Sequence, residues 1–262
     1  MNQILKSLAN KFGFEVTRVP RTDRVIDADS LGELDYYKTP HGNYYVPRDA
    51  PDDVIINCIK SGKVFEPEIV ETAKKYITKG SVVLDVGANF GQMSVLFSDI
   101  AGGDGIVYAF EADDFVFDVL EKNIEANVRK NIEPVFGAVF NESGKELFFP
   151  KQDFKRFAAY GSYGIDPNAR AGRKVTSLMI DDIEFTKPVS FMKVDVQGSD
   201  LFAMQGAIET IRKHRMPILF EFEQQFQDEF GTSFQDYVKF IDSIGYEFSA
   251  VINQINYLVT PK

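Results

Sequence analysis

The segment Asp85-Val86-Gly87-Ala88-Asn89-Phe90-Gly91 combines a carboxylate with two glycines at the spacing of a ligand-binding loop. Gly87 allows a sharp turn close to a ligand, and Gly91 lets a helix begin tightly against the preceding strand. A dinucleotide-binding loop favours Gly-x-Gly-x-x-Gly, but Asn89 and Gln92 replace two of those glycines. S-adenosylmethionine carries a sulfonium and an ammonium, which suit the acidic first residue, and its carboxylate can use the helix N-terminus. The loop therefore favours S-adenosylmethionine over a dinucleotide.

A second carboxylate, Glu111, ends the next predicted strand, where ribose hydroxyl groups would lie. NAD-binding enzymes use the same device, and an isolated glutamate at this place is often only solvated. Together with the loop at residues 85–91, it supports a nucleoside-bearing cofactor. The cofactor-binding residues that we expect are Asp85, Gly87, Ala88, Asn89, Gly91, Glu111, Ala112, Gly137, Ala138 and Asp195.

Further carboxylates end later strands and are candidates for catalysis. Transfer of a methyl group is an in-line displacement, and an alcohol needs a base or a metal ion to help it lose its proton. Asp195 and Glu221 end two strands that should neighbour the strand of Asp85, and Lys193 points to the same face as Asp195. We predict these three as catalytic, with Asp195 and Glu221 as the ligands if a divalent cation takes part. The alternatives are a helix cap for Asp195 and simple charge pairing for Lys193.

The segment 151–174 has no clear periodicity and is rich in basic and tyrosine side chains. A loop of this length inside a compact domain is often a binding loop. Its positive charge would suit an anionic acceptor such as a sugar phosphate, although a solvated excursion explains it equally well. The expected substrate-binding residues are Arg156, Tyr160, Tyr163, Arg173 and, from a strand end, Glu223.

Strand and helix patterns alternate along the chain. The elements that they predict must position the candidate residues. Short apolar runs predict strands at 82–86, 106–110, 135–139, 189–195, 217–223, 246–251 and 255–259. Helical spacing of apolar residues fills the intervals. This order predicts a doubly wound, mostly parallel seven-stranded α/β sheet, Rossmann-like and of the class I methyltransferase kind, with a C-terminal antiparallel hairpin.

The first 60 residues form a predicted N-terminal extension to a domain spanning 61–262. Apolar residues at helical spacing predict a helix within residues 1–20, and a hairpin with its turn at 39–43 comes next. The helix packs on the domain or a second subunit, or contacts a membrane surface. In the domain itself, we expect a helix from Pro67 to 79–80 and a single helix over 201–211.

Several of these segments occur together in one known family. In order, they are Phe65-Glu66-Pro67, Val83-Leu84-Asp85-Val86-Gly87-Ala88-Asn89-Phe90-Gly91, Ala109-Phe110-Glu111, Lys122-Asn123-Ile124-Glu125-Ala126-Asn127, Lys193-Val194-Asp195-Val196-Gln197-Gly198 and Leu219-Phe220-Glu221. This run resembles the FkbM family of S-adenosylmethionine-dependent methyltransferases. The resemblance implies O-methylation of a hydroxyl, usually on a sugar of a polysaccharide, glycolipid, nucleotide sugar or natural product. Two departures are Ala112, where the family often has proline, and Gln197, where it commonly has glutamate.

The composition restricts the classes of partner that we expect this protein to bind. A formal charge of −10 and an isoelectric point near 4.8 argue against nucleic acid, because phosphate binding requires a basic face. A single cysteine, Cys58, excludes an internal disulfide and fits the cytoplasm. No apolar run is long enough to span a membrane, and the oligomeric state is open. Three alternative functions remain: N-methylation on the same fold, an NAD-binding oxidoreductase, and a non-catalytic partner protein.

Overall fold

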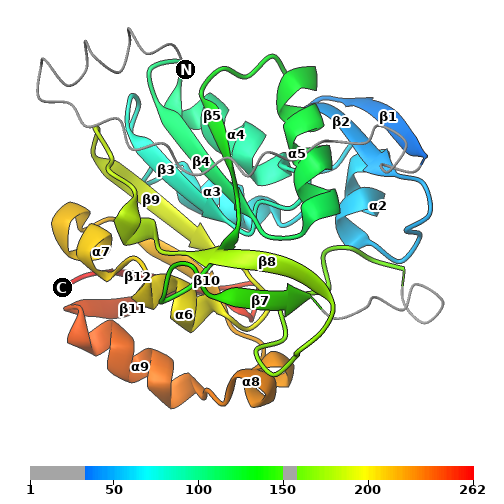
Figure 1. Ribbon diagram of the computed structural model, residues 1–262. Coiled ribbons are helices and arrows are strands. Elements are labelled where there is room, and N and C mark those ends of the chain that lie inside the picture. Colours follow the sequence, from blue (N-terminus) through cyan, green and yellow to red (C-terminus); the bar gives the residue numbers. More distant parts are fainter. Residues whose placement is uncertain (1–32, 150–157) are drawn as a thin grey trace, which may run out of the picture.

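The structure is a computed structural model that describes residues 33–149 and 158–262 (Figure 1). The helix expected within residues 1–20 therefore lies outside the described residues. Within the described part of the chain, no helix is long and apolar enough to cross a membrane.

A seven-stranded sheet forms the centre of the fold, in the order β11-β12-β10-β9-β3-β4-β5. The strands are β3 (Val82–Val86), β4 (Ile106–Glu111), β5 (Ile132–Phe136), β9 (Val189–Val194), β10 (Ile218–Glu221), β11 (Tyr246–Ile252) and β12 (Asn256–Pro261). The pairs among β5, β4, β3, β9 and β10 are parallel, and only β12 runs antiparallel to its neighbours. This arrangement confirms the predicted mostly parallel sheet with a closing hairpin.

Both faces of the sheet are covered, because neighbouring residues of each buried strand point to opposite sides. Val83 packs into a core with the helices on one face, whereas Leu84 packs into a second core on the other. The first face carries α2 (Val54–Lys60), α3 (Pro67–Ala73), α4 (Gln92–Ala101) and α5 (Asp114–Ala126). The second carries α6 (Asp200–Gln205), α7 (Ile208–His214) and α9 (Phe234–Ser243). The sheet is thus doubly wound, as predicted.

The predicted hairpin forms from β1 (Leu34–Thr39) and β2 (Gly42–Pro47), which lie beside α5 (Figure 1). Two asparagines at the C-terminal end of α5 hold it. Asn123 accepts a hydrogen bond from the amide of Tyr45 at 2.6 Å, and its own amide donates to the carbonyl of Phe90 at 2.9 Å. Asn127 accepts from the amide of Asn43 at 2.8 Å. The end of α5 therefore ties the hairpin to the loop at 85–91.

Two predicted elements are interrupted in the structure. The strand expected at 135–139 divides at Gly137 into β5 and β6 (Ala138–Val139), because Gly137 has a φ of +149° and bends the chain. The helix expected over 201–211 divides into α6 and α7 at Gly206, where an added Cβ would lie 2.0 Å from the carbonyl oxygen of Phe140. The helix beginning at Pro67 also ends early, at Ala73, and tighter turns replace its last predicted residues.

Other elements were not predicted. Helix α2 comes after the hairpin, and its N-cap is Asp53, whose carboxylate accepts the amide of Ile56 at 3.0 Å. Helix α8 (Gln224–Phe230) comes after β10. A separate three-stranded sheet, ordered β6-β8-β7, contains β7 (Glu146–Phe149) and β8 (Arg173–Leu178), so the end of the segment 151–174 is the start of a strand.

Candidate active site

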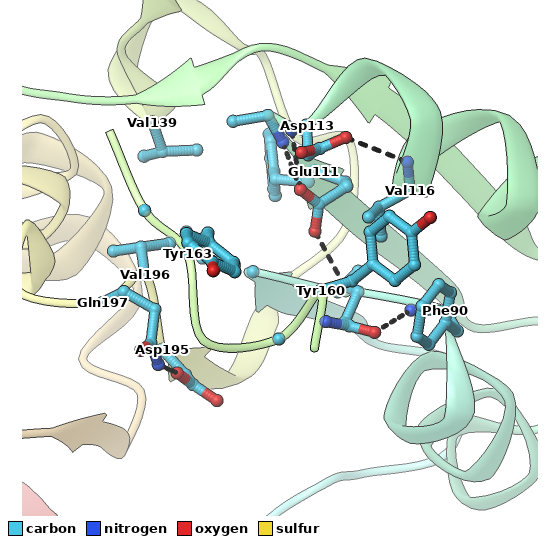
Figure 2. A pocket seen from close by; sticks show the side chains of 18 of the residues that line it. Phe90, Glu111, Asp113, Val116, Val139, Tyr160, Tyr163, Asp195, Val196 and Gln197 are labelled. Carbon is cyan, nitrogen blue, oxygen red and sulfur yellow. Dashed lines mark hydrogen bonds between the residues drawn. The ribbon is translucent and has the colours of Figure 1, made fainter. Parts of the chain in front are cut away.

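A cavity opens at the carboxyl ends of β3, β4 and β9, as expected for ligands of a doubly wound sheet. The loops after these strands line it, together with the segment 160–165 (Figure 2). Of the residues predicted for the cofactor, those lining the cavity are Gly87, Ala88, Asn89, Glu111, Ala112, Gly137, Ala138 and Asp195. Asp85 and Gly91 lie behind this lining.

The two glycines of the loop after β3, Gly87 and Gly91, have different structural roles. Gly87 has a φ of +81°, and an added Cβ would lie 1.8 Å from the backbone oxygen of Asp195. Only glycine lets the loop after β3 approach the loop after β9 this closely. Gly91, with a φ of +85°, precedes α4, and its Cβ would lie 2.5 Å from Leu120 Cδ1 of α5. Gly87 therefore shapes the cavity, while Gly91 allows two helices to pack behind it.

Glu111 ends β4 with its side chain in the cavity wall. Its carboxylate accepts backbone amide hydrogen bonds from Asn89 at 2.9 Å, and from Ala112 and Asp113 at 2.8 Å each (Figure 2). Burial raises the pKa of Glu111 to about 7, although these three donors lower it. A carboxylate so placed, beside apolar side chains such as Val116 and Val139, suits the ribose and base of a nucleoside.

Asp85 lies in β3 rather than in the loop, and it is fully buried. Its Oδ2 accepts a hydrogen bond from Ser94 Oγ at 2.5 Å, but its Oδ1 has no hydrogen-bond partner within the described residues. The ammonium of Lys193 lies 3.8 Å from Oδ1. Burial raises the pKa of Asp85, and Lys193 opposes this shift. Asp85 thus contributes negative charge from beneath the loop.

Lys193 is buried between two carboxylates. Its Nζ lies 3.2 Å from Asp195 Oδ2, and it also donates to the carbonyl of Gly87 at 3.3 Å. Burial alone would lower the pKa of Lys193, but Asp195 and Asp85 outweigh burial and raise it above its ordinary value. Lys193 is therefore a fixed cation that orients Asp195, which leaves it unsuited to accepting a proton itself.

Asp195 and Glu221 are joined by the residue that departs from the family pattern. Gln197, with a φ of +51°, donates from Nε2 to Asp195 Oδ1 and to Glu221 Oε2, both at 3.2 Å. Burial and the charge of Asp195 raise the pKa of Glu221 above its usual range. Glu221 is not among the residues that line the cavity. Asp195 is one of them (Figure 2).

These residues do not form a set of ligands for a divalent cation. Over 33–149 and 158–262, no three His, Cys, Asp or Glu side chains are grouped so that they could hold a metal ion. Asp195 and Glu221 instead share the amide of Gln197, and the ammonium of Lys193 lies beside Asp195.

The structure places some of the predicted substrate-binding residues in the cavity lining and others away from it. Tyr160 and Tyr163 line the cavity (Figure 2). The ring of Tyr160 stacks on that of Phe115, with centroids 4.9 Å apart. Asp53 holds this segment by accepting the amides of Tyr160 and Gly161 at 2.8 and 3.2 Å.

Of the other three predicted substrate-binding residues, two lie outside the cavity lining and one lies outside the described residues. Arg173 begins β8, outside the lining, and pairs with Asp113 and Asp114 at 2.5 and 2.6 Å. Glu223 precedes α8 and accepts a hydrogen bond from Gln225 at 3.0 Å, also outside the lining. Arg156 lies outside the described residues. The basic charge of Arg173 is thus already neutralised by two aspartates.

Glu66 and Gln92 are among the lining residues that were not predicted. Glu66 lines the cavity near Asp195 and Lys193, whose charges both shift its pKa. Gln92 also lines it and holds the backbone before Glu66, because its Oε1 accepts the amide of Phe65 at 2.8 Å. A signal for Glu66 was present in the sequence, since the Phe65-Glu66-Pro67 segment is part of the family resemblance.

Fold and site together define a methyltransferase of the class I type: a seven-stranded sheet with one antiparallel strand, and a ribose-suited carboxylate after its second parallel strand. The model of the methyltransferase FkbM domain matches residues 85–248. The chain belongs to this family, which confirms the predicted class of enzyme and, with it, S-adenosylmethionine as methyl donor.

Three solved structures similar to this chain have low sequence identity to it. The methyltransferase FkbM from Methylobacillus flagellatus KT is 16% identical with a TM-score of 0.45, covering 72% of this chain, which spans only 49% of that protein. M. jannaschii TYW2 in complex with S-adenosylmethionine is 13% identical with a TM-score of 0.46, covering 87% and 84% of the two chains. A methyltransferase from Aquifex aeolicus is 16% identical with a TM-score of 0.43, covering 79% and 92%. No curated protein matches.

Proposed function

We propose that this protein transfers the methyl group of S-adenosylmethionine to a hydroxyl group of a sugar-containing acceptor. The observation that carries the proposal is the polarity of the cavity. Its charged lining residues are Glu66, Glu111, Asp113, Asp195 and Lys193, four acids against one base. An acidic wall favours a sulfonium and an ammonium and disfavours the pyrophosphate of a dinucleotide.

Some residues of the cavity would bind the ligands, and others would take part in the methyl transfer. Glu111 would hold the ribose hydroxyl groups, and the apolar side chains near it would contact the base. S-adenosylmethionine supplies an electrophilic methyl group on sulfur. Asp195 would accept the proton of the acceptor hydroxyl, because it reaches the cavity and Lys193 fixes its orientation. Tyr160 and Tyr163 would cover the bound ligands.

The proposal is tested by binding first and by transfer second. S-adenosylhomocysteine should raise the melting temperature, since a ligand of the folded state stabilises it by mass action, whereas NAD should not. The protein is then incubated with S-adenosylmethionine and separate neutral sugars, sugar phosphates, nucleotide sugars and glycans, and products are examined for added methyl groups by mass spectrometry. Stabilisation by NAD but not by S-adenosylhomocysteine would refute the choice of cofactor.

N-methylation is the second candidate, because an acidic cavity also attracts a cationic amine. The segment after β9 reads Asp195-Val196-Gln197-Gly198, and not the Asn-Pro-Pro-Tyr or Asp-Pro-Pro-Tyr reported for methylation of amino groups. Methylation of an amino sugar on nitrogen, with no product from its hydroxyl analogue, would favour this alternative. The cytoplasm, and an acceptor other than nucleic acid, remain part of the proposal, supported by the single cysteine and the net negative charge.

A further inference from the structure

Glu66 is a charged residue of the cavity that was not predicted as a site residue, and it precedes the matched family domain, which begins at residue 85. It immediately precedes α3 in a left-handed conformation, with φ 46° and ψ 61°. A side chain at this position usually caps the helix, but the carboxylate of Glu66 makes no capping hydrogen bond. It lies instead in the wall of the cavity.

One turn, distant in the sequence, fixes one oxygen of this carboxylate. Glu66 Oε1 accepts hydrogen bonds from Asn253 Nδ2 at 2.6 Å and from Asn256 Nδ2 at 3.1 Å, both at the turn that joins β11 to β12. The backbone beside Glu66 is held by Gln92, which accepts the amide of Phe65 and donates to the carbonyl of Lys63 at 3.0 Å. Glu66 is therefore a positioned group rather than a mobile surface carboxylate.

The other oxygen, Oε2, accepts no hydrogen bond from any described residue, so it can receive one from a ligand. Its neighbours restrict the ligand. Burial and the charge of Asp195 raise the pKa of Glu66, and Lys193 lowers it, so these three groups share one electrostatic environment. Two carboxylates against one ammonium repel a phosphate or a carboxylate and attract the hydrogen of a hydroxyl.

We infer that Glu66 binds a hydroxyl group of the acceptor next to the one that is methylated, and that the acceptor carries no anionic group at this end of the cavity. This inference rests on the proposed function and specifies its substrate class: a neutral polyhydroxylated compound that presents neighbouring hydroxyl groups to Glu66 and Asp195. Glu66 is thus a specificity-determining residue, and the Asn253–Asn256 turn positions it.

The test compares the full chain with the variants Glu66→Gln and Glu68→Gln, in the presence of saturating S-adenosylhomocysteine. Glu68 is exposed in the first turn of α3 and serves as the matched control. The Glu66→Gln side chain keeps an oxygen for the two asparagines but loses the charge. Binding of methyl α-glucoside, glucose 6-phosphate and glucosamine is measured by calorimetry, and S-adenosylhomocysteine affinity and melting temperature are measured for every variant.

We expect methyl α-glucoside to bind the parent chain more tightly than glucose 6-phosphate does, and Glu66→Gln to weaken that binding about 10-fold or more. The affinity for S-adenosylhomocysteine should fall much less than the sugar affinity in Glu66→Gln and stay unchanged in Glu68→Gln, a difference that a merely structural role of Glu66 would not produce. Tighter binding of glucose 6-phosphate or of glucosamine, equal sugar binding by both variants, or no sugar binding at all would overturn the inference. Failure of the parent chain to bind S-adenosylhomocysteine would instead refute the proposed function.

Discussion

The substitution Glu111→Gln removes the charge of this side chain and keeps its shape. In the parent structure, Oε1 accepts two backbone amides and Oε2 accepts one, from Asn89. The variant keeps the first two interactions, but its amide group faces the amide of Asn89, donor against donor. Leaving that buried donor unsatisfied should cost about 1–3 kcal/mol of folding stability. The variant should therefore fold, with a lower melting temperature than the parent chain.

The effect on the cofactor results from the lost charge. Hydrogen bonds to an ionised acceptor are roughly twice as strong as neutral ones, so each of two ribose hydroxyl groups should lose about 1 kcal/mol. A total of about 2 kcal/mol corresponds to a Kd about 30-fold higher for S-adenosylhomocysteine at pH 8. Glu133→Gln, an exposed change on the neighbouring strand β5, is the control and should leave the Kd unchanged.

The pH dependence provides a second measurement of the same group. The pKa of Glu111 is raised to about 7, so the free carboxyl group is protonated below that pH. Ribose hydroxyl groups favour the ionised form, and affinity in the parent chain should therefore fall as the pH drops below 7, by up to about tenfold per pH unit. Folding stability has the opposite sign: the contribution of neutral Glu111 is fully present below its ordinary pKa of 4.5 and is lost as the pH rises to about 7.

Calorimetric titration with S-adenosylhomocysteine between about pH 5.5 and 8.5 measures the effect on binding, and thermal melts over the same range measure the effect on stability. In Glu111→Gln, the affinity should be lower at pH 8 and flat through the range where the parent chain varies. Equal affinities of the parent and the variant at pH 8 would refute the assignment of Glu111 to the ribose. A slope that persists unchanged in the variant would show that another group titrates.

Three further predictions concern the other side of the cavity. Gly87→Ala should lower stability by about 2 kcal/mol or more, since its Cβ meets the backbone of Asp195; unchanged urea denaturation would contradict that close approach. Lys193→Met should destabilise the fold by about 3–5 kcal/mol by leaving Asp85 buried without its cation, and adding Asp85→Asn should restore part of the loss in thermal melts. Asp195→Asn should retain S-adenosylhomocysteine binding but slow turnover about 10²–10⁴-fold; parent-like turnover with a lower melting temperature would mean that Asp195 only supports the fold.

The central sheet could be predicted because its strands are buried on both faces and appear in the sequence as apolar runs. β3 is buried along its whole length and matches the predicted 82–86. The break at Gly137 was missed because Val135 and Val139 flank it in one apolar run, although a glycine inside a strand pattern can mark a bend. Helix α8 was missed because its sequence is mostly polar and partly exposed, so it has no periodic apolar face to reveal it.

The part of the cavity around Asn89 and Glu111 was easier to place from the sequence than the part around Glu66. Asn89 and Glu111 follow or end neighbouring strands, in segments whose glycines and carboxylates are close together in the sequence. Arg173 was expected to meet an anionic acceptor, but Asp113 and Asp114 already pair with it, a contact across about 60 residues that composition does not reveal. Glu66 depends on still more distant partners.

The hydrogen bonds that hold Glu66 also set the order in which the site can assemble on the ribosome. Asn253 and Asn256 lie 187 and 190 residues after Glu66. At about 5–20 residues per second, the chain carrying Glu66 waits about 10–40 s for these partners to be synthesised. The loops that surround Glu111 are complete long before that. A nascent chain can therefore form the half of the cavity around Glu111 first, whereas the half around Glu66 is completed only when the last hairpin pairs with β10.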